Sequence, residues 1–151
     1  MLIITLFVFT GCNSNKPNES GDTMDIYEKT NYGENIEVLN ETEKEVLLCV
    51  SFVEEVNSGG FEGYFSTEYS KYCVEAVAYL EKNKSEVYPE MLKQAISLFP
   101  DDFDFSNPVE TQEYLEENED ILEKFEELEA NIYNSTEDID SILENLEEQI
   151  K

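Results

Sequence analysis

The stretch Val56–Phe65 joins flexible glycines to large aromatic residues, and it constrains the fold more than any other part of the chain. It holds three of the six glycines, Gly59, Gly60 and Gly63, and glycine adopts left-handed backbone geometry without steric cost. Three rings follow at i, i+3 and i+4, on one side of a helical turn: Phe61, Tyr64 and Phe65. The pattern predicts a helix that ends, turns tightly on Gly59 and Gly60, and restarts with an aromatic plug.

The apolar spacing around this hinge predicts an all-α domain of five to seven helices packed as an irregular bundle. We expect the first long helix to begin at Thr42, with Glu45 closing a capping box. The hinge would then connect this helix to a second core helix, which carries apolar residues from Tyr69 to Leu80. The two helices would form an antiparallel pair. The predicted hinge residues are Asn57, Gly59, Gly60, Phe61, Tyr64 and Phe65.

Proline and asparagine residues mark the other helices. Pro89 is a good first-turn residue, and Pro100 ends that helix. Asn107-Pro108 begins the next one, with a break expected near Asn118. Two further helices follow, separated by residues 134–136, and no alternating strand pattern competes with them. Residues 24–40 are expected to form only a short helix and a packed arm, and residues 101–107 a loop that tucks two rings under the helices.

The hinge also carries a family resemblance. The run Val-Asn-Ser-Gly-Gly-Phe-x-x-Tyr-Phe from Val56 to Phe65 resembles the Asn-Gly-Gly-Phe signature of the acidic DNA-mimic protein family of bacteria. The resemblance extends from about Asn40 to the C-terminus, through Ser97-Leu98-Phe99-Pro100 and the pattern Leu128-Glu129-x-x-Ile132-Tyr133. It implies an all-helical protein that acts as a homodimer and whose acidic surface occupies the DNA site of a basic protein such as a transcription factor.

The charge balance excludes whole classes of partner. The chain has 36 acidic and 9 basic residues, a formal net charge of −27, and every basic residue is lysine. Nucleic-acid binding needs a basic face that neutralises phosphates, so direct binding to nucleic acid is not expected. High net charge can indicate disorder, but 40% apolar residues with 9 Phe and 9 Tyr favour a folded acidic domain.

The acids concentrate in the last third of the chain, where residues 101–151 hold 19 acids and 2 lysines. Acids one helical turn apart lie ~5–6 Å apart between Cβ atoms, the order of phosphate spacing along DNA. We therefore expect an acidic face that binds in a basic groove of a partner protein or peptide. A face that only keeps the protein solvated is the simpler alternative. The predicted partner surface consists of Glu116, Glu117, Glu119, Asp120, Glu123, Glu126, Glu127, Glu144, Glu147 and Glu148.

The first residues have the pattern of a lipoprotein signal. Leu2 to Thr10 matches a secretory apolar region and is too short to span a bilayer. Phe9-Thr10-Gly11-Cys12 resembles a bacterial lipobox, although no Lys or Arg precedes the run and Phe9 stands where Leu is usual. The predicted organisation is a signal at 1–11, lipidated Cys12 with a tether to residue 23, and an acidic helical domain at 24–151. A cleaved ordinary signal peptide is the alternative.

This leader predicts a lipid-anchored protein outside the cytoplasm, where it would not meet transcription factors. We therefore expect a basic extracellular or envelope protein, peptide or toxin as the partner, bound through electrostatic attraction. The alternatives are a solvating lipoprotein domain without a ligand and a hydrolase that uses paired carboxylates.

Few residues indicate chemistry. The chain has no His and no phosphate-binding glycine loop, so neither an enzyme nor a cofactor is predicted. The spacing of a calcium-binding loop occurs at Asp102, Asp104, Ser106, Glu110 and Glu113. However, Asn107 stands where such a loop has its turn glycine, and Pro108 stands at the position that binds calcium through its backbone carbonyl. No metal is therefore predicted. Cys49 and Cys73 lie on the two helices beside the hinge, where buried thiols are favoured over a disulfide.

Overall fold

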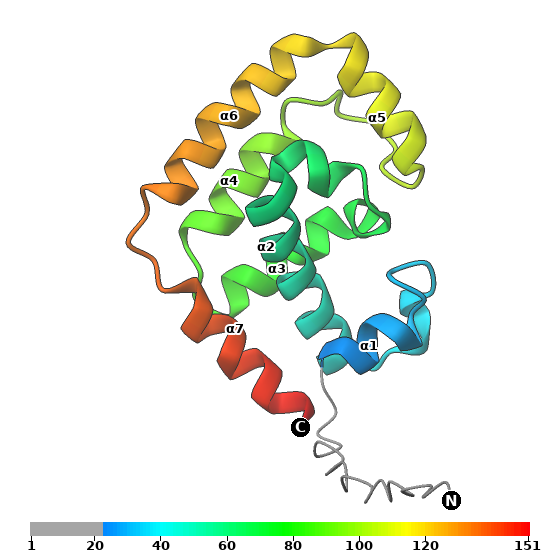
Figure 1. The fold of residues 1–151 in the computed structure, drawn as a ribbon, viewed down its shortest axis with the longest axis vertical. Coiled ribbons are helices and arrows are strands. Elements are labelled where there is room, and N and C mark those ends of the chain that lie inside the picture. The colour runs from blue at the N-terminus through cyan, green and yellow to red at the C-terminus, as the bar shows by residue number, and fades with distance from the viewer. Residues whose placement is uncertain (1–22) are drawn as a thin grey trace, which may run out of the picture.

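The computed structural model describes residues 23–151. The other helices pack around a central kinked helix, α2 (Figure 1). All secondary structure in these residues is helical, so the predicted all-α bundle is confirmed. The α-helices are α1 (Thr23–Lys29), α2 (Glu41–Phe65), α3 (Cys73–Lys82), α4 (Val87–Ile96), α5 (Pro108–Glu117), α6 (Glu119–Tyr133) and α7 (Ile139–Glu147). Short 3-10 turns occupy Ile36–Val38, Glu68–Tyr72 and Glu148–Ile150.

The start of α2 corrects the predicted cap. Asn40, not Thr42, is the N-cap, and it forms a capping box with Glu43. The Asn40 side chain accepts a hydrogen bond from the Glu43 N–H at 3.0 Å, and the Glu43 carboxylate accepts one from the Asn40 N–H at 2.9 Å. The same local signature was therefore present two residues earlier, where asparagine caps at least as well as threonine. Glu45 is instead buried.

The break in α2 lies at Gly60 alone, whose φ is 67° and ψ −170°. The prediction that Gly59 also turns is wrong, because Gly59 keeps helical geometry and a Cβ there would meet nothing within 4 Å. The kink also does not lead directly into α3. The chain continues as one more helical turn to Phe65, and the link 66–72 makes the connection. α3 then crosses α2 obliquely instead of forming the expected antiparallel pair (Figure 1).

The aromatic plug forms as predicted and fills the centre of the core. Phe61, Tyr64 and Phe65 have no exposed surface. The Phe65 ring lies 5.0 Å from the ring of Phe99 and 5.6 Å from that of Phe125, measured between centroids. The loop at 101–107 adds Phe103 and Phe105, which pack against the core as expected. The rings therefore join α2, the segment that follows α4, and α6 into one core.

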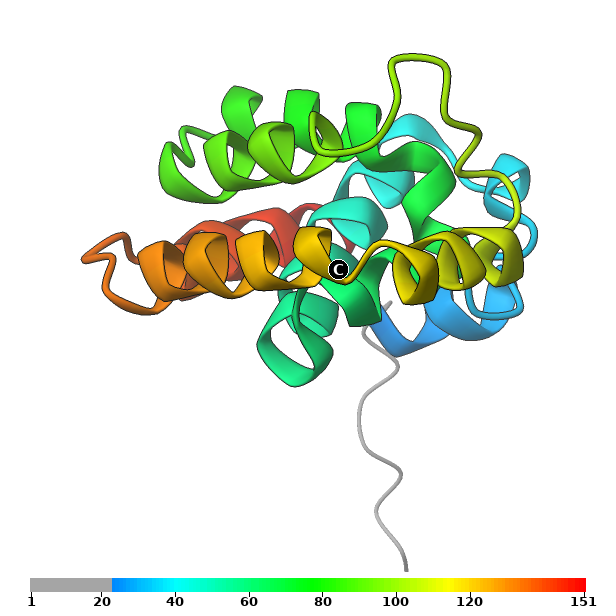
Figure 2. The ribbon, with the colours of Figure 1, turned by 90° about the horizontal axis from the view of Figure 1, so that it is seen from above.

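The C-terminal helices wrap around the outside of this core. α5 begins at Pro108 behind its Asn107 cap, and α6 follows after the single residue Asn118, as predicted. α6 packs against α4 and α2, and α7 packs against α2. α5, α6 and α7 together form a continuous outer border of the molecule (Figure 1), and Figure 2 shows α5 and α6 following one another on the side away from α3. No helix in residues 23–151 is both long and apolar enough to cross a membrane.

Candidate acidic interaction surface

The acids predicted on α5 and α6 all reach solvent. We call the following set the α5–α6 acidic face: Glu116, Glu117, Glu119, Asp120, Glu123, Glu126 and Glu127, each of which is exposed. The apolar residues of α6 point the other way, since Ile121, Phe125, Leu128 and Ile132 are buried. The amphipathic spacing of α6 therefore separates a core-facing stripe from a charged one.

No cation within residues 23–151 pairs with this face. The ion pairs there are Lys29–Glu43, Lys71–Glu68, Lys82–Glu45 and Lys93–Glu81. All four involve residues before position 94, so the negative charge of α5 and α6 is not compensated inside the described chain. Lys124 is the one lysine between positions 101 and 150. The field of this face is therefore available to a basic partner.

The charge density of the face is close to that of DNA. Seven acids fall within the twelve residues 116–127, and a helix rises ~1.5 Å per residue. This gives roughly one negative charge per 2.5 Å, or one per ~3 Å after subtracting Lys124. Duplex DNA carries one charge per ~1.7 Å of axis and each strand one per ~3.4 Å. The face thus falls between a single strand and a duplex in linear charge.

The three acids predicted on the last helix divide into two kinds. Glu144 on α7 and Glu148 just after it are exposed. Glu147 is half-buried, and its carboxylate accepts a hydrogen bond from the Thr23 hydroxyl at 2.7 Å. Glu147 therefore ties the C-terminal helix to α1, a role that a helix-surface pattern alone does not reveal.

Two acids that sequence analysis missed hold helix N-termini in place. Glu129 on α6 accepts a hydrogen bond from the Phe61 N–H at 2.8 Å, so it caps the helical turn that restarts after Gly60. Glu137 accepts from the N–H groups of Glu86 at 2.8 Å and Val87 at 2.7 Å, at the start of α4. Both carboxylates meet free N–H groups at the positive end of a helix dipole. A cap supplied from 50 or more residues away leaves no local sequence signal.

A third acid serves the interior of the N-terminal half. The Glu45 side chain is only 7% exposed. It accepts hydrogen bonds at 2.6 Å from both Lys82 Nζ and Asn83 Nδ2. Because a buried carboxylate is costly unless it is paired and hydrogen-bonded, these two contacts hold the end of α3 against the start of α2.

The hinge is a packing corner and carries no reactive group. Asn57 and Gly59 are exposed on the helix before the kink, whereas the three rings after it are fully buried. A Cβ on Gly60 would overlap the Glu129 carboxylate. The close approach of α2 to Glu129 therefore requires glycine both for its positive φ and for its lack of a side chain.

The calcium-like spacing does not assemble into a site. Asp104 accepts a hydrogen bond from the Ser106 N–H at 2.9 Å, which holds the pKa of Asp104 below its usual value. Glu110 accepts one from the Asn107 amide at 2.7 Å. Within residues 23–151, no three His, Cys, Asp or Glu side chains are grouped so that they could hold a metal ion.

Cys49 and Cys73 are free buried thiols, as favoured above. Burial is the main cause that raises the pKa of each thiol to about 12. Such groups act as small apolar residues and not as nucleophiles.

Comparison with known proteins adds the family. A family model described as DMP19-like protein matches residues 37–151. The chain belongs to the DMP19-like protein family. This is a DNA-mimic family, and the matched region includes the hinge and all of α2 to α7. Comparison with curated proteins and with solved structures finds no match.

Membership of the DMP19-like family agrees with the range of the resemblance, which begins near Asn40 and reaches the C-terminus. Cys12 and the predicted signal and tether precede the matched region and lie outside the described residues. The predicted lipid anchor therefore remains a prediction.

Proposed function

We propose that this protein is a non-enzymatic, DNA-mimic-like binding module whose α5–α6 acidic face occupies a basic surface of a partner protein. The observation that carries the proposal is the absence of any cation partner for this face within residues 23–151, at a linear charge density close to that of DNA. Membership of a DNA-mimic family supports the same interpretation. Glu144 on α7 and Glu148 just after it extend the negative field toward the C-terminus.

Electrostatic recognition of this kind has a defined salt signature. Attraction between exposed charges is screened within about 8 Å at physiological ionic strength, and complementary charge acts chiefly on association rate and partner choice. The partner should therefore be retained at low salt and released at high salt. DNA bound to the same basic surface in a test solution should be displaced when this protein is added.

A matched pair of triple variants tests the proposal. Glu123, Glu126 and Glu127 are changed to Gln in the first variant, and the exposed residues Glu28, Glu62 and Glu75 in the control, so that both lose three charges. A basic protein captured at low salt is identified, and displacement of labelled DNA from it is followed by fluorescence anisotropy. We expect the first variant to need about ten-fold more protein for displacement and the control to need less than two-fold more.

Two outcomes contradict the proposal. If both triple variants weaken displacement equally, net charge and not the α5–α6 acidic face is responsible. If no protein is retained at low salt and released at high salt, the protein is a solvating domain without a specific ligand, which is the simpler alternative.

We further propose that Cys12 is lipidated and that the partner is a basic protein, peptide or toxin of the cell envelope or exterior. The support is the length of the apolar run before Cys12 and the small residue that precedes it. Metabolic labelling with a palmitate analogue should mark the membrane fraction, and Cys12→Ala should abolish the label. Label that persists in Cys12→Ala would exclude this anchor and place the search for a partner in another compartment.

A further inference from the structure

A cleft of about 530 Å³ lies on a different part of the surface, between the end of α1, the second half of α2 and the link 66–72. Its walls include three tyrosines, Tyr27, Tyr32 and Tyr69, and three glutamates, the adjacent Glu54 and Glu55 and also Glu68. No lysine is among its lining residues. The cleft thus combines aromatic rings with negative charge, and neither the acidic-face proposal nor the core accounts for it.

The three rings are held in a defined arrangement. The Tyr27 ring lies 6.0 Å from Tyr69 at an interplanar angle of 82°, and 6.4 Å from Tyr32 at 30°, between centroids. Gly33, with a φ of 95°, lets the loop after α1 approach the Tyr69 ring, because a Cβ there would lie 2.7 Å from Tyr69 Cε1. The loop therefore packs against Tyr69 through Gly33 and positions Tyr32 beside the Tyr27 ring.

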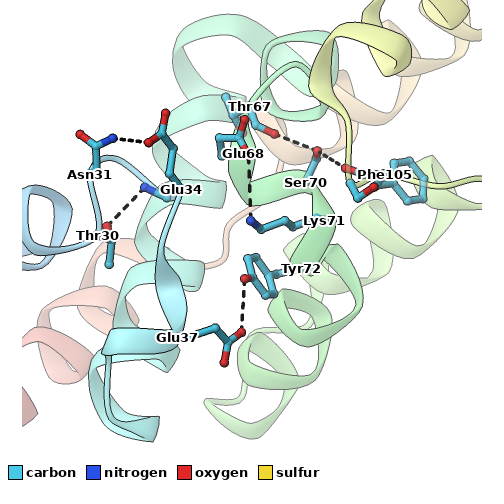
Figure 3. A network of polar contacts seen from close by, with 12 residues as sticks. Thr30, Asn31, Glu34, Glu37, Thr67, Glu68, Ser70, Lys71, Tyr72 and Phe105 are labelled. Atoms are coloured by element: carbon cyan, nitrogen blue, oxygen red, sulfur yellow. Dashed lines mark hydrogen bonds and ion pairs between the residues drawn. The ribbon is translucent and has the colours of Figure 1, made fainter.

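The Tyr32 ring is kept at the mouth of the cleft by an unusual backbone. Asn31 and Tyr32 both have positive φ values, 51° and 55°, and this region is costly for a bulky side chain. Hydrogen bonds hold the loop: the Tyr32 N–H donates to the Tyr27 carbonyl at 2.8 Å, and the Gly33 N–H donates to the Thr30 hydroxyl at 3.3 Å. Figure 3 shows Thr30 and Asn31 in this loop, opposite Thr67 and Glu68. The result is a tyrosine that is 60% exposed in a hydrogen-bonded turn.

Two of the three glutamates of the cleft, Glu54 and Glu55, lack a cation, whereas Glu68 pairs with Lys71 at 3.9 Å. Glu54 accepts a hydrogen bond from the Tyr27 hydroxyl at 3.0 Å. Glu55 is half-buried and forms no ion pair with any lysine of residues 23–151. Burial first, and then the charge of Glu54, raise the pKa of Glu55. The cleft therefore holds negative charge that a positive ligand would neutralise.

We propose that this cleft binds an organic cation, the alkylammonium or guanidinium head group of a lysine or arginine side chain or of a free amine. The faces of the tyrosine rings would attract the cation through their quadrupoles, while Glu54 and Glu55 supply opposite charge at the cleft wall. An anion would be repelled, and a neutral apolar group would leave the carboxylates uncompensated. The inference does not depend on the α5–α6 acidic face.

Titration of the full-length protein with small probes tests the proposal. The probes are the N-acetyl methylamides of lysine and arginine, free spermidine as the small-amine source, and the N-acetyl methylamide of norleucine as a neutral match for lysine. Tyrosine chemical shifts in NMR spectra report binding. We expect binding of the cations in the millimolar range at low salt and no saturable binding of the norleucine compound. Tighter binding of the amino-acid amides than of spermidine would identify a protein side chain as the ligand, and the reverse would identify a free amine.

Variants locate the binding. Tyr32→Asn removes the ring but keeps a residue that tolerates left-handed backbone, so the turn should persist. We expect it to weaken cation binding about five-fold, Glu55→Gln to weaken it about three-fold, and Tyr32→Phe to leave it within two-fold. The matched controls are Tyr133→Ala, which removes a ring that is 61% exposed on α6, and Glu123→Gln, which removes one charge from α6.

The outcomes separate this cleft from the acidic face. Equal binding of the norleucine compound, or equal weakening by the α6 controls, would overturn the proposal. Unchanged cation binding in Tyr32→Asn would do the same. Loss of DNA displacement without loss of cation binding would instead concern the proposed function alone.

Discussion

Two groups of acids in this protein differ in what surrounds them, although the sequence presents them alike. Glu45, Glu129 and Glu137 are buried or half-buried and accept hydrogen bonds from distant parts of the chain. The acids of the α5–α6 face are exposed and have no lysine partner within residues 23–151. The first group stabilises the fold, and the second repels itself. The number of acidic residues therefore does not indicate whether they stabilise the fold or bind a partner. The position of each carboxylate in the structure does.

The largest expected effect on stability comes from a substitution at Gly60, next to the N–H of Phe61 that Glu129 caps. Gly60→Val introduces a β-branched residue at φ 67° and pushes its Cβ into the Glu129 carboxylate. We expect a loss of about 2–4 kcal/mol in the free energy of unfolding, measured by urea denaturation followed by circular dichroism. Binding by the fraction that stays folded should be unchanged.

The neighbouring glycine provides the control. Gly59 is helical and a Cβ there meets nothing, so Gly59→Ala should be neutral or stabilise by up to about 1 kcal/mol. Equal destabilisation by both substitutions would contradict the assignment of the break to Gly60.

The next effect compares one acid from each group. Glu137→Ala removes the acceptor for two N–H groups at the start of α4 and should cost about 1–3 kcal/mol. Glu127→Ala on the exposed face should stay within about 0.5 kcal/mol of the wild type. The comparison between the groups fails if the two variants have the same urea midpoint.

A smaller effect concerns pH at the Asn40 capping box. The hydrogen bond from the Asn40 N–H, followed by the interaction with Lys29, lowers the pKa of Glu43 from its ordinary 4.5. A folded pKa below the unfolded one means that this stabilisation is present above pH 4.5 and is lost as the pH falls through the folded value.

The measurement is the thermal midpoint of wild type and Glu43→Gln at pH 6 and pH 3. We expect Glu43→Gln to be less stable at pH 6, by under about 1 kcal/mol because the side chain is only half-buried and solvent screens its charge, and the gap to close at pH 3. The exposed Glu75→Gln should show no such gap. A gap that persists at pH 3 would mean that the charge of Glu43 does not contribute.

The smallest effect has the opposite sign. Changing Glu123, Glu126 and Glu127 to Gln removes like charges one turn apart, each pair of which costs about 0.2–0.5 kcal/mol. We expect the variant to gain a few tenths of a kcal/mol at low salt and nothing at high salt, measured from urea midpoints. A clear loss of stability would place these acids in the first group and remove the distinction.

Several elements could be predicted from sequence because their signals are local. Asn107 and Pro108 begin α5 as expected, since capping and a fixed proline φ act over three or four residues. The apolar spacing of α6 correctly predicted its buried face. The first cap was misplaced by two residues because Thr42 and Asn40 both fit a capping-box pattern, and only the position of the arm before α2 chooses between them.

The residues of the two candidate sites differ in the same way. The exposed acids of α5 and α6 follow from helix periodicity, which predicts the outward side once the apolar side is known. The tyrosine cleft does not follow from helix periodicity, because its residues come from the turn at Tyr32, from α2 and from the link that holds Tyr69.

The sequence by itself determined the helical class, the excess of negative charge and the need for glycine at the kink of α2, since these depend on composition, periodicity and backbone sterics. Tertiary structure alone decided which carboxylates accept hydrogen bonds that stabilise the fold. Glu129 and Glu137 reach helix N-termini 68 and 50 residues away in the chain. No pattern read along one helix contains that information, because a cap supplied through space depends on how the helices are packed.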